Sequence, residues 1–93
     1  MATLSVYILE HCLGCEEARR LAAAIPARFG ELLVRVVDLD REPDARPASL
    51  VAVPTYMLDG KVISLGNPRQ ADLVHDLERL LTRASHGEGE SKT

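Results

Sequence analysis

Apolar residues in the first part of the chain change from a continuous run to a helical spacing and back again. Residues 3–9 (TLSVYIL) are apolar and β-branched with little alternation, which is typical of a strand covered on both faces. From Cys15 the apolar residues recur at intervals of three and four, which predicts an amphipathic helix that ends near Pro26. Residues 32–39 (LLVRVVDL) have the composition of a second strand. Together these segments predict a βαβ unit with parallel strands.

The second part of the chain predicts a hairpin followed by a helix. Residues 40–52 carry two prolines and have room for only a short helical turn near 48–51. Residues 54–65 hold two strand-like runs on either side of Asp59-Gly60, which is a strong hairpin signal. A second amphipathic helix follows, with an apolar face made of Leu73, Val74, Leu77, Leu80 and Leu81. The element order is β-α-β-(α)-β-β-α, which belongs to the α/β class.

One domain accounts for the patterned part of the chain. A chain of 93 residues does not hold two independent cores, and 46% apolar residues with only 3% aromatic ones predict an aliphatic core. We assign residues 1–84 to this domain. Residues 85–93 (SHGEGESKT) contain no apolar anchor, so we expect them to form a disordered tail.

Charge and hydropathy argue against two classes of partner. The formal net charge is −3 with mixed signs, which provides no basic surface for nucleic acid. Glu10 and His11 interrupt the first apolar run too early for a signal peptide or a transmembrane segment. We therefore expect no membrane association and a cytoplasmic, reducing setting.

The two cysteines of the chain, Cys12 and Cys15, form a CxxC motif with Leu13 and Gly14 between them. Two thiols at this spacing can exchange electrons, bind a soft metal ion or simply pack in the core. A lone CxxC in a reducing setting is more often catalytic or metal-binding than structural. A disulfide across so short a loop would also remove little entropy from the unfolded chain.

The element order, with CxxC at the start of the first helix, resembles the thioredoxin-fold superfamily in its compact glutaredoxin-like form. Residues 52–66 (AVPTYMLDGKVISLG) are similar to the proline, hairpin and glycine segment of that family. The resemblance covers roughly residues 3–84, and it implies a thioredoxin-like fold with a mixed four-stranded sheet flanked by helices. The chain departs from the family in having no proline between the cysteines and no tryptophan before them.

The resemblance also implies a site and a reaction. Pro54 is expected to follow a cis peptide bond and to lie against the cysteines, and Val53, Pro54 and Thr55 are expected to bind substrate. The implied activity is that of a thiol–disulfide oxidoreductase acting on disulfides of proteins or small molecules. Electrons would come from glutathione or a reductase, so glutathione is a candidate co-substrate, and we expect neither a resident cofactor nor a metal. We expect a monomer.

The position of the motif suggests a role for each thiol. Cys12 stands just before the first helix, where free backbone N–H groups and the helix dipole favour a thiolate, so we expect its pKa to be lowered. His11, if protonated, would favour the thiolate further, whereas Glu10 would oppose it. Cys15 lies about one turn further along and should be less exposed. We therefore expect Cys12 to attack a substrate disulfide and Cys15 to resolve the mixed disulfide.

Two other functions compete with this interpretation. Residues 11–18 (HCLGCEEA) also resemble the CxxC segment of heavy-metal-associated copper carriers, and two thiolates can bind Cu(I) or share Zn(II) with other ligands. Such carriers have no use for the Val53-Pro54-Thr55 segment or the hairpin after it. A binding module within a larger redox system is the third alternative, because fold does not dictate function.

Overall fold

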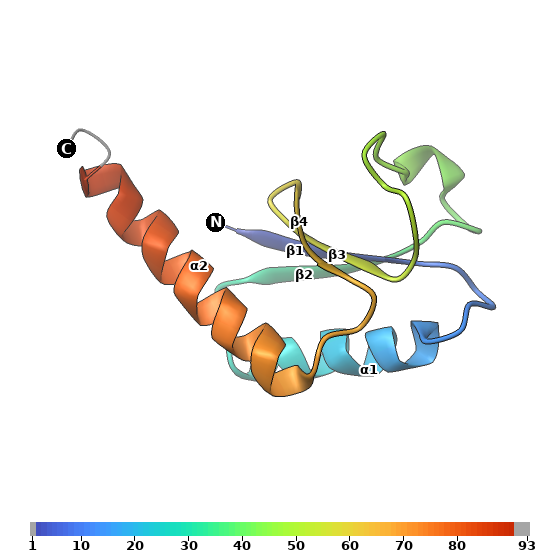
Figure 1. The fold of residues 1–93 in the computed structure, drawn as a ribbon, viewed down its shortest axis with the longest axis horizontal. Helices are drawn as coiled ribbons and strands as arrows, with labels where there is room; N and C mark the ends of the chain where they lie inside the picture. Colours follow the sequence, from blue (N-terminus) through green and yellow to red (C-terminus); the bar gives the residue numbers. More distant parts are fainter. Residues whose placement is uncertain (1, 91–93) are drawn as a thin grey trace.

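A computed structural model of the chain describes the backbone of residues 2–90 and the side chains of residues 2–83. It forms an α/β structure with four strands and two α-helices (Figure 1). In chain order the elements are β1 (Thr3–Ile8), α1 (Cys15–Ala24), a 3₁₀ turn (Ile25–Ala27), β2 (Leu33–Asp38), a second 3₁₀ turn (Pro43–Ala45), β3 (Thr55–Leu58), β4 (Lys61–Leu65) and α2 (Gln70–Glu90). The predicted order of strands and helices is thereby confirmed.

The four strands make one mixed sheet in the order β2-β1-β3-β4. β1 and β2 run parallel with Thr3 opposite Leu33, which confirms the predicted βαβ unit. β3 runs antiparallel to β1 and to β4. Asp59 and Gly60 form the hairpin turn with φ angles of 51° and 87°, as a two-residue turn with left-handed central residues requires.

The two helices cover the same face of the sheet and build the main core there (Figure 1). Alternation along β1 directs Leu4, Val6 and Ile8 to this face, where all three are fully buried. Their helical partners are the buried residues Ala18, Leu21 and Ala22 of α1 and Leu73 and Leu77 of α2. The periodicity in the sequence predicted these apolar positions because each helix has one face against the sheet.

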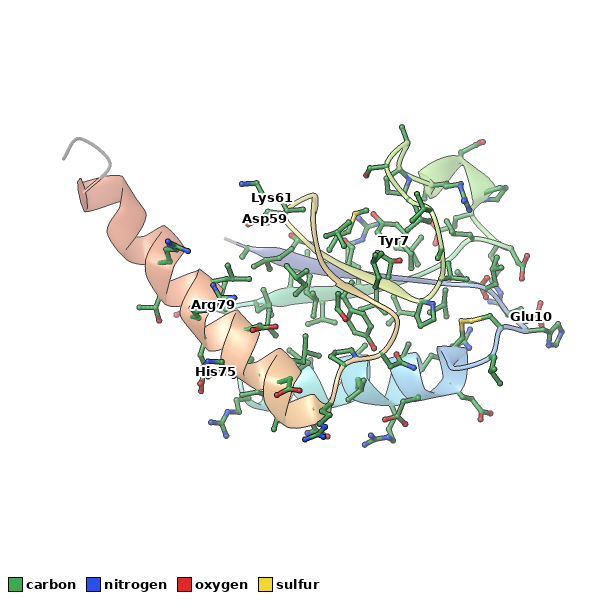
Figure 2. All side chains as sticks on the ribbon, viewed as in Figure 1. Tyr7, Glu10, Asp59, Lys61, His75 and Arg79 are labelled. Atoms are coloured by element: carbon green, nitrogen blue, oxygen red, sulfur yellow. A yellow bond between two sulfur atoms is a disulfide. The ribbon has the colours of Figure 1, made fainter. Side chains whose placement is uncertain are left out.

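The opposite face carries a smaller core beneath the segment that joins β2 to β3. Tyr7 lies on this face (Figure 2), together with Val37, Leu39, Leu50 and Met57. The stretch 48–51, which has room for only a short turn, holds a single turn closed by the N–H of Leu50 and the carbonyl of Pro47 at 3.1 Å. A 3₁₀ turn that the sequence did not predict lies before it, at Pro43–Ala45. Pro47 explains why the 3₁₀ turn ends at Ala45, because the residue before a proline is driven out of the helical region, and Arg46 is extended with ψ 118°.

α2 is 21 residues long and continues past Ser85, where the sequence predicts that the tail begins, to Glu90. No proline follows Pro68 to end the helix earlier. The last three positions of the expected tail, 91–93, lie outside the described residues. Within the described part of the chain, no helix combines the length and the apolar composition needed to cross a membrane.

Leu77 anchors α2 in the main core, and its side chain is 0% exposed. We expect Leu77→Ala to lower the free energy of unfolding by about 2–4 kcal/mol, because it removes buried methyl groups and leaves a cavity. Leu33→Ala is the control. Leu33 is 52% exposed, and its truncation should cost less than about 1 kcal/mol. Denaturant titration of both variants measures the difference, and equal losses would place α2 outside the core.

Candidate functional site

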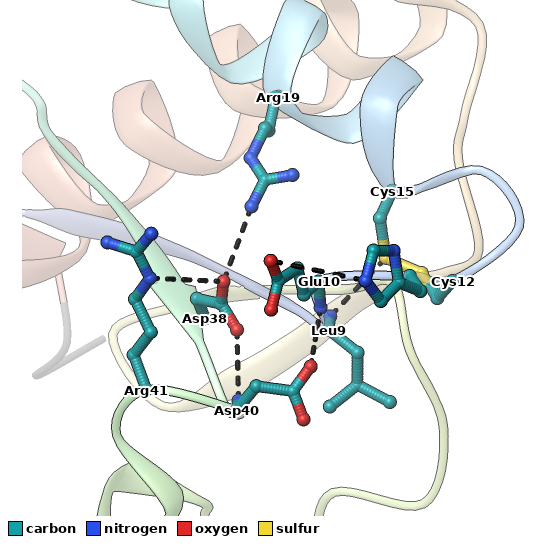
Figure 3. Close-up of polar contacts among 9 residues, drawn as sticks. Leu9, Glu10, Cys12, Cys15, Arg19, Asp38, Asp40 and Arg41 are labelled. Carbon is teal, nitrogen blue, oxygen red and sulfur yellow. Dashed lines mark hydrogen bonds and ion pairs between the residues drawn. A yellow bond between two sulfur atoms is a disulfide. The ribbon is translucent and has the colours of Figure 1, made fainter.

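Cys12 and Cys15 lie at the junction between the carboxyl end of β1 and the first turn of α1, where they form a disulfide (Figure 3). Their Cα atoms are 5.3 Å apart. This separation is within the range that a disulfide requires. The fold therefore places the two sulfur atoms in covalent reach without any rearrangement of the backbone.

The two sulfurs differ in their environment. Cys15 is the first residue of α1 and belongs to the main core, with 1% of its side chain exposed. The backbone N–H of Leu9 donates a hydrogen bond to Cys15 Sγ at 3.4 Å. Cys12 packs against the same core but is only half-buried, so it is the thiol that a partner can reach. The predicted order of exposure is confirmed.

Gly14 makes the turn from the cysteine loop into α1. Its φ of 89° lies in the left-handed region, which a side chain disfavours. Its carbonyl accepts the first hydrogen bond of the helix from the N–H of Ala18 at 3.0 Å. Leu13 beside it points into solvent and is 98% exposed. A Cβ on Gly14 would lie 3.1 Å from Asn67 Nδ2, so Asn67 leaves no room for a side chain at this position without moving.

Asn67 is a part of the site that the sequence analysis missed. Its Nδ2 donates a hydrogen bond to the Gly14 carbonyl at 2.7 Å, and its Oδ1 accepts one from the Tyr56 hydroxyl at 2.8 Å. Tyr56 is fully buried, and this burial raises the pKa of Tyr56 to about 12. No local pattern marks Asn67, because its partners lie 11 and 53 residues away.

The Val53-Pro54-Thr55 segment lies against the cysteine loop, as expected from the family resemblance. The Val53–Pro54 peptide bond is cis, so that prediction is confirmed. The Cδ of Pro54 lies 4.0 Å from the position that a Cβ on Gly14 would take. The Pro54 carbonyl accepts a hydrogen bond from the N–H of Gly66 at 2.8 Å, which ties the segment to the end of β4.

The side chains on either side of Pro54 are not equally available. Val53 is half-buried and packs against the smaller core. Thr55 is 0% exposed, and its hydroxyl donates to the carbonyl of Ala52 at 2.6 Å. The Thr55 side chain therefore holds its own segment in place, and the backbone of Val53 is the part of this segment suited to contact a substrate.

Glu10 and His11 are exposed on the loop before the motif. Their side chains are 56% and 90% exposed, and His11 Nε2 lies 4.0 Å from Glu10 Oε2. At such exposure, interactions with neighbouring charges are strongly screened by water.

An acidic turn after β2 anchors this loop, and the sequence analysis did not identify it. The N–H of Glu10 donates to Asp40 Oδ2 at 2.7 Å, and the N–H of Asp40 donates to Asp38 Oδ1 at 2.9 Å (Figure 3). Arg19 of α1 and Arg41 approach Asp38 Oδ2 at 3.4 and 4.0 Å. The turn therefore connects the cysteine loop, β2 and α1 by polar contacts.

The placement of the side chains also bears on metal binding. Among the residues with described side chains, no three of the types His, Cys, Asp and Glu lie together as a group able to hold an ion. Cys12 and Cys15 are the pair of soft ligands that the fold brings together.

We expect Gly14→Ala to lower the free energy of unfolding by about 1–2 kcal/mol, because an L side chain is strained at a φ of 89°. Its added methyl group also has to displace the Asn67 amide. Gly30→Ala is a matched control, since Gly30 is not among the glycines with positive φ and has open space around it. That variant should stay within about 1 kcal/mol of wild type. Equal effects in chemical denaturation would contradict the role given to Gly14.

Comparison of the sequence with models of protein families gives no match, and comparison with curated proteins finds no relative. Function is therefore inferred from the geometry of the cysteine pair and its surroundings.

Proposed function

We propose that this protein is a thiol–disulfide oxidoreductase with a thioredoxin-like, glutaredoxin-like fold. The observation that carries the proposal is the pairing of a half-buried cysteine with a buried one at the first turn of α1. The sheet order β2-β1-β3-β4, with its parallel β1–β2 pair, and the cis proline next to the motif support the same conclusion.

The reaction divides into two exchanges between sulfur atoms. The Cys12 thiolate attacks one sulfur of a substrate disulfide, which forms a mixed disulfide and releases the other sulfur as a thiolate that takes up a proton. Cys15 then loses its proton and attacks Cys12 Sγ. This second step forms the Cys12–Cys15 disulfide and releases the remaining substrate thiol. Two electrons and two protons from glutathione or a reductase restore the dithiol.

Local electrostatics would set how readily Cys12 ionises. The amino end of α1 presents backbone N–H groups that favour a negative charge, and this should lower the pKa of Cys12 in the reduced protein. Glu16 and Glu17 in the first turn of α1 oppose the effect. Cys15, in the apolar core, is better suited to remain a thiol until a mixed disulfide brings a leaving group within reach.

The surroundings of the motif suggest how a substrate is held. Backbone groups at Val53 would bind the chain on one side of the attacked disulfide. Leu13 and Val51, with exposed fractions of 98% and 75%, provide apolar surface on the cysteine loop and on the segment before Pro54. Disulfides in proteins or of glutathione are the substrate classes that follow from this proposal.

Single-cysteine variants test the two roles. Cys12→Ser should abolish reduction of insulin or of a glutathione mixed disulfide, because it removes the attacking sulfur. Cys15→Ser should keep the first exchange and accumulate a mixed disulfide, which mass spectrometry detects. A wild-type protein that is inert in both assays but binds one Cu(I) or Zn(II) tightly would instead support the metal-carrier alternative.

Glu10→Gln and His11→Ala test whether the exposed charges before the motif control its reactivity. We expect each to change the alkylation rate of reduced Cys12 by less than about twofold, because exposed charges are screened. The measurement is the pH dependence of alkylation in the Cys15→Ser background, in which Cys12 is the one thiol that can be alkylated. A change of about tenfold in either variant would show that Glu10 or His11 determines the pKa of Cys12.

A further inference from the structure

The side-chain amide of Asn67 joins three parts of the molecule at the cysteine motif. It donates to the Gly14 carbonyl at 2.7 Å, between the two cysteines, and accepts from the Tyr56 hydroxyl of β3 at 2.8 Å. The preceding residue, Gly66, is bound through its N–H to the Pro54 carbonyl at 2.8 Å. Asn67 is the single asparagine in the chain.

The chemistry of its partners allows only one orientation of this amide. The Gly14 carbonyl is an acceptor only, so the group that faces it has to be the NH₂ of Asn67. Oδ1 therefore faces the Tyr56 hydroxyl, which has to donate. A tyrosine hydroxyl keeps its proton at neutral pH, and burial raises the pKa of Tyr56 further, to about 12, so the orientation is maintained.

We propose that Asn67 is a positioning residue that holds the backbone between Cys12 and Cys15 and favours the reduced, thiolate form of the motif. This inference rests on the proposed oxidoreductase function. The Gly14 carbonyl receives two hydrogen bonds, one from Ala18 within α1 and one from Asn67 outside it. The second bond ties the left-handed turn at Gly14 to the connection between β4 and α2. It also directs the positive end of the Asn67 amide dipole toward the CxxC motif.

The charged groups around the motif explain why an uncharged donor is useful there. Glu10 and His11 lie on the preceding loop, Glu16 and Glu17 in the first turn of α1, and Asp40 contacts the loop from the end of β2. Glu17 is paired with Arg20, and Glu10 and His11 are exposed and screened by water, so none of these ionisable groups is placed to hold a thiolate. The Asn67 amide favours the thiolate at every pH, because it does not titrate.

Asn67→Ala, Asn67→Asp and Tyr56→Phe test the proposal, with Gln70→Ala as control. Gln70 is the single glutamine of the chain, is exposed and lies three residues further along. Two quantities are measured on the purified full chain, namely the thiol pKa from the absorbance of the thiolate and the equilibrium constant for oxidation by glutathione disulfide. Both report the state of the sulfurs and not the rate of turnover with a protein substrate.

We expect Asn67→Ala to raise the thiol pKa and to increase the oxidation constant about three- to tenfold. At 29.6 mV per tenfold change, this makes the potential about 14–30 mV more negative. Asn67→Asp should have a larger effect in the same direction, because it places a carboxylate opposite the Gly14 carbonyl. Tyr56→Phe should have a smaller effect, because it only releases Oδ1. Gln70→Ala should match wild type.

A folded Asn67→Ala protein with wild-type pKa and oxidation constant would overturn the positioning role, as would an equal shift in Gln70→Ala. Cooperative unfolding at the wild-type midpoint establishes that a variant is folded. Should Asn67→Ala fail to fold, the thiol pKa and the oxidation constant of Tyr56→Phe test the positioning role, and wild-type values of both would overturn it. A wild-type protein whose cysteines do not equilibrate with glutathione would overturn the proposed function itself, which is a distinct outcome.

Discussion

Burial of the Cys15 side chain in the main core is the constraint on which the site depends. Because Cys15 is both the first residue of α1 and a core residue, packing of the helix against the sheet holds one sulfur at the end of β1. The Leu9 N–H completes this placement through its hydrogen bond to Cys15 Sγ. Cys12 then has to lie at the edge of the same core, half-buried and opposite a sulfur that cannot move away.

Contacts from distant segments complete the motif. Pro54 reaches the loop from the start of β3, Asn67 from the connection between β4 and α2, and Asp40 from the turn after β2. All of these segments meet at one end of the sheet, because β1 and β2 run parallel and end there together, while β3 runs antiparallel and begins there. A short cysteine loop thereby acquires neighbours on several sides without a long insertion.

The parts of the fold that follow a strict period could be predicted from the sequence. The β1 run, the amphipathic spacing of α1 and the Asp59-Gly60 hairpin are local signals, and each is present in the structure. The stretch 48–51 holds no more than one hydrogen-bonded turn, as expected, whereas the 3₁₀ turn Pro43–Ala45 was not predicted. Cys12, Cys15 and Pro54 could be identified because a motif or a resemblance marks each of them.

The sequence by itself determined the class of the fold, the residues of the core and the presence of a cysteine pair at a helix start. These features depend on side-chain periodicity and short spacing, which act within one element. Only the tertiary structure decided that Asn67 and Asp40 belong to the site and that the Thr55 hydroxyl faces its own segment. Hydrogen bonds across 30 or 53 residues depend on how strands and helices pack, and no local pattern records them.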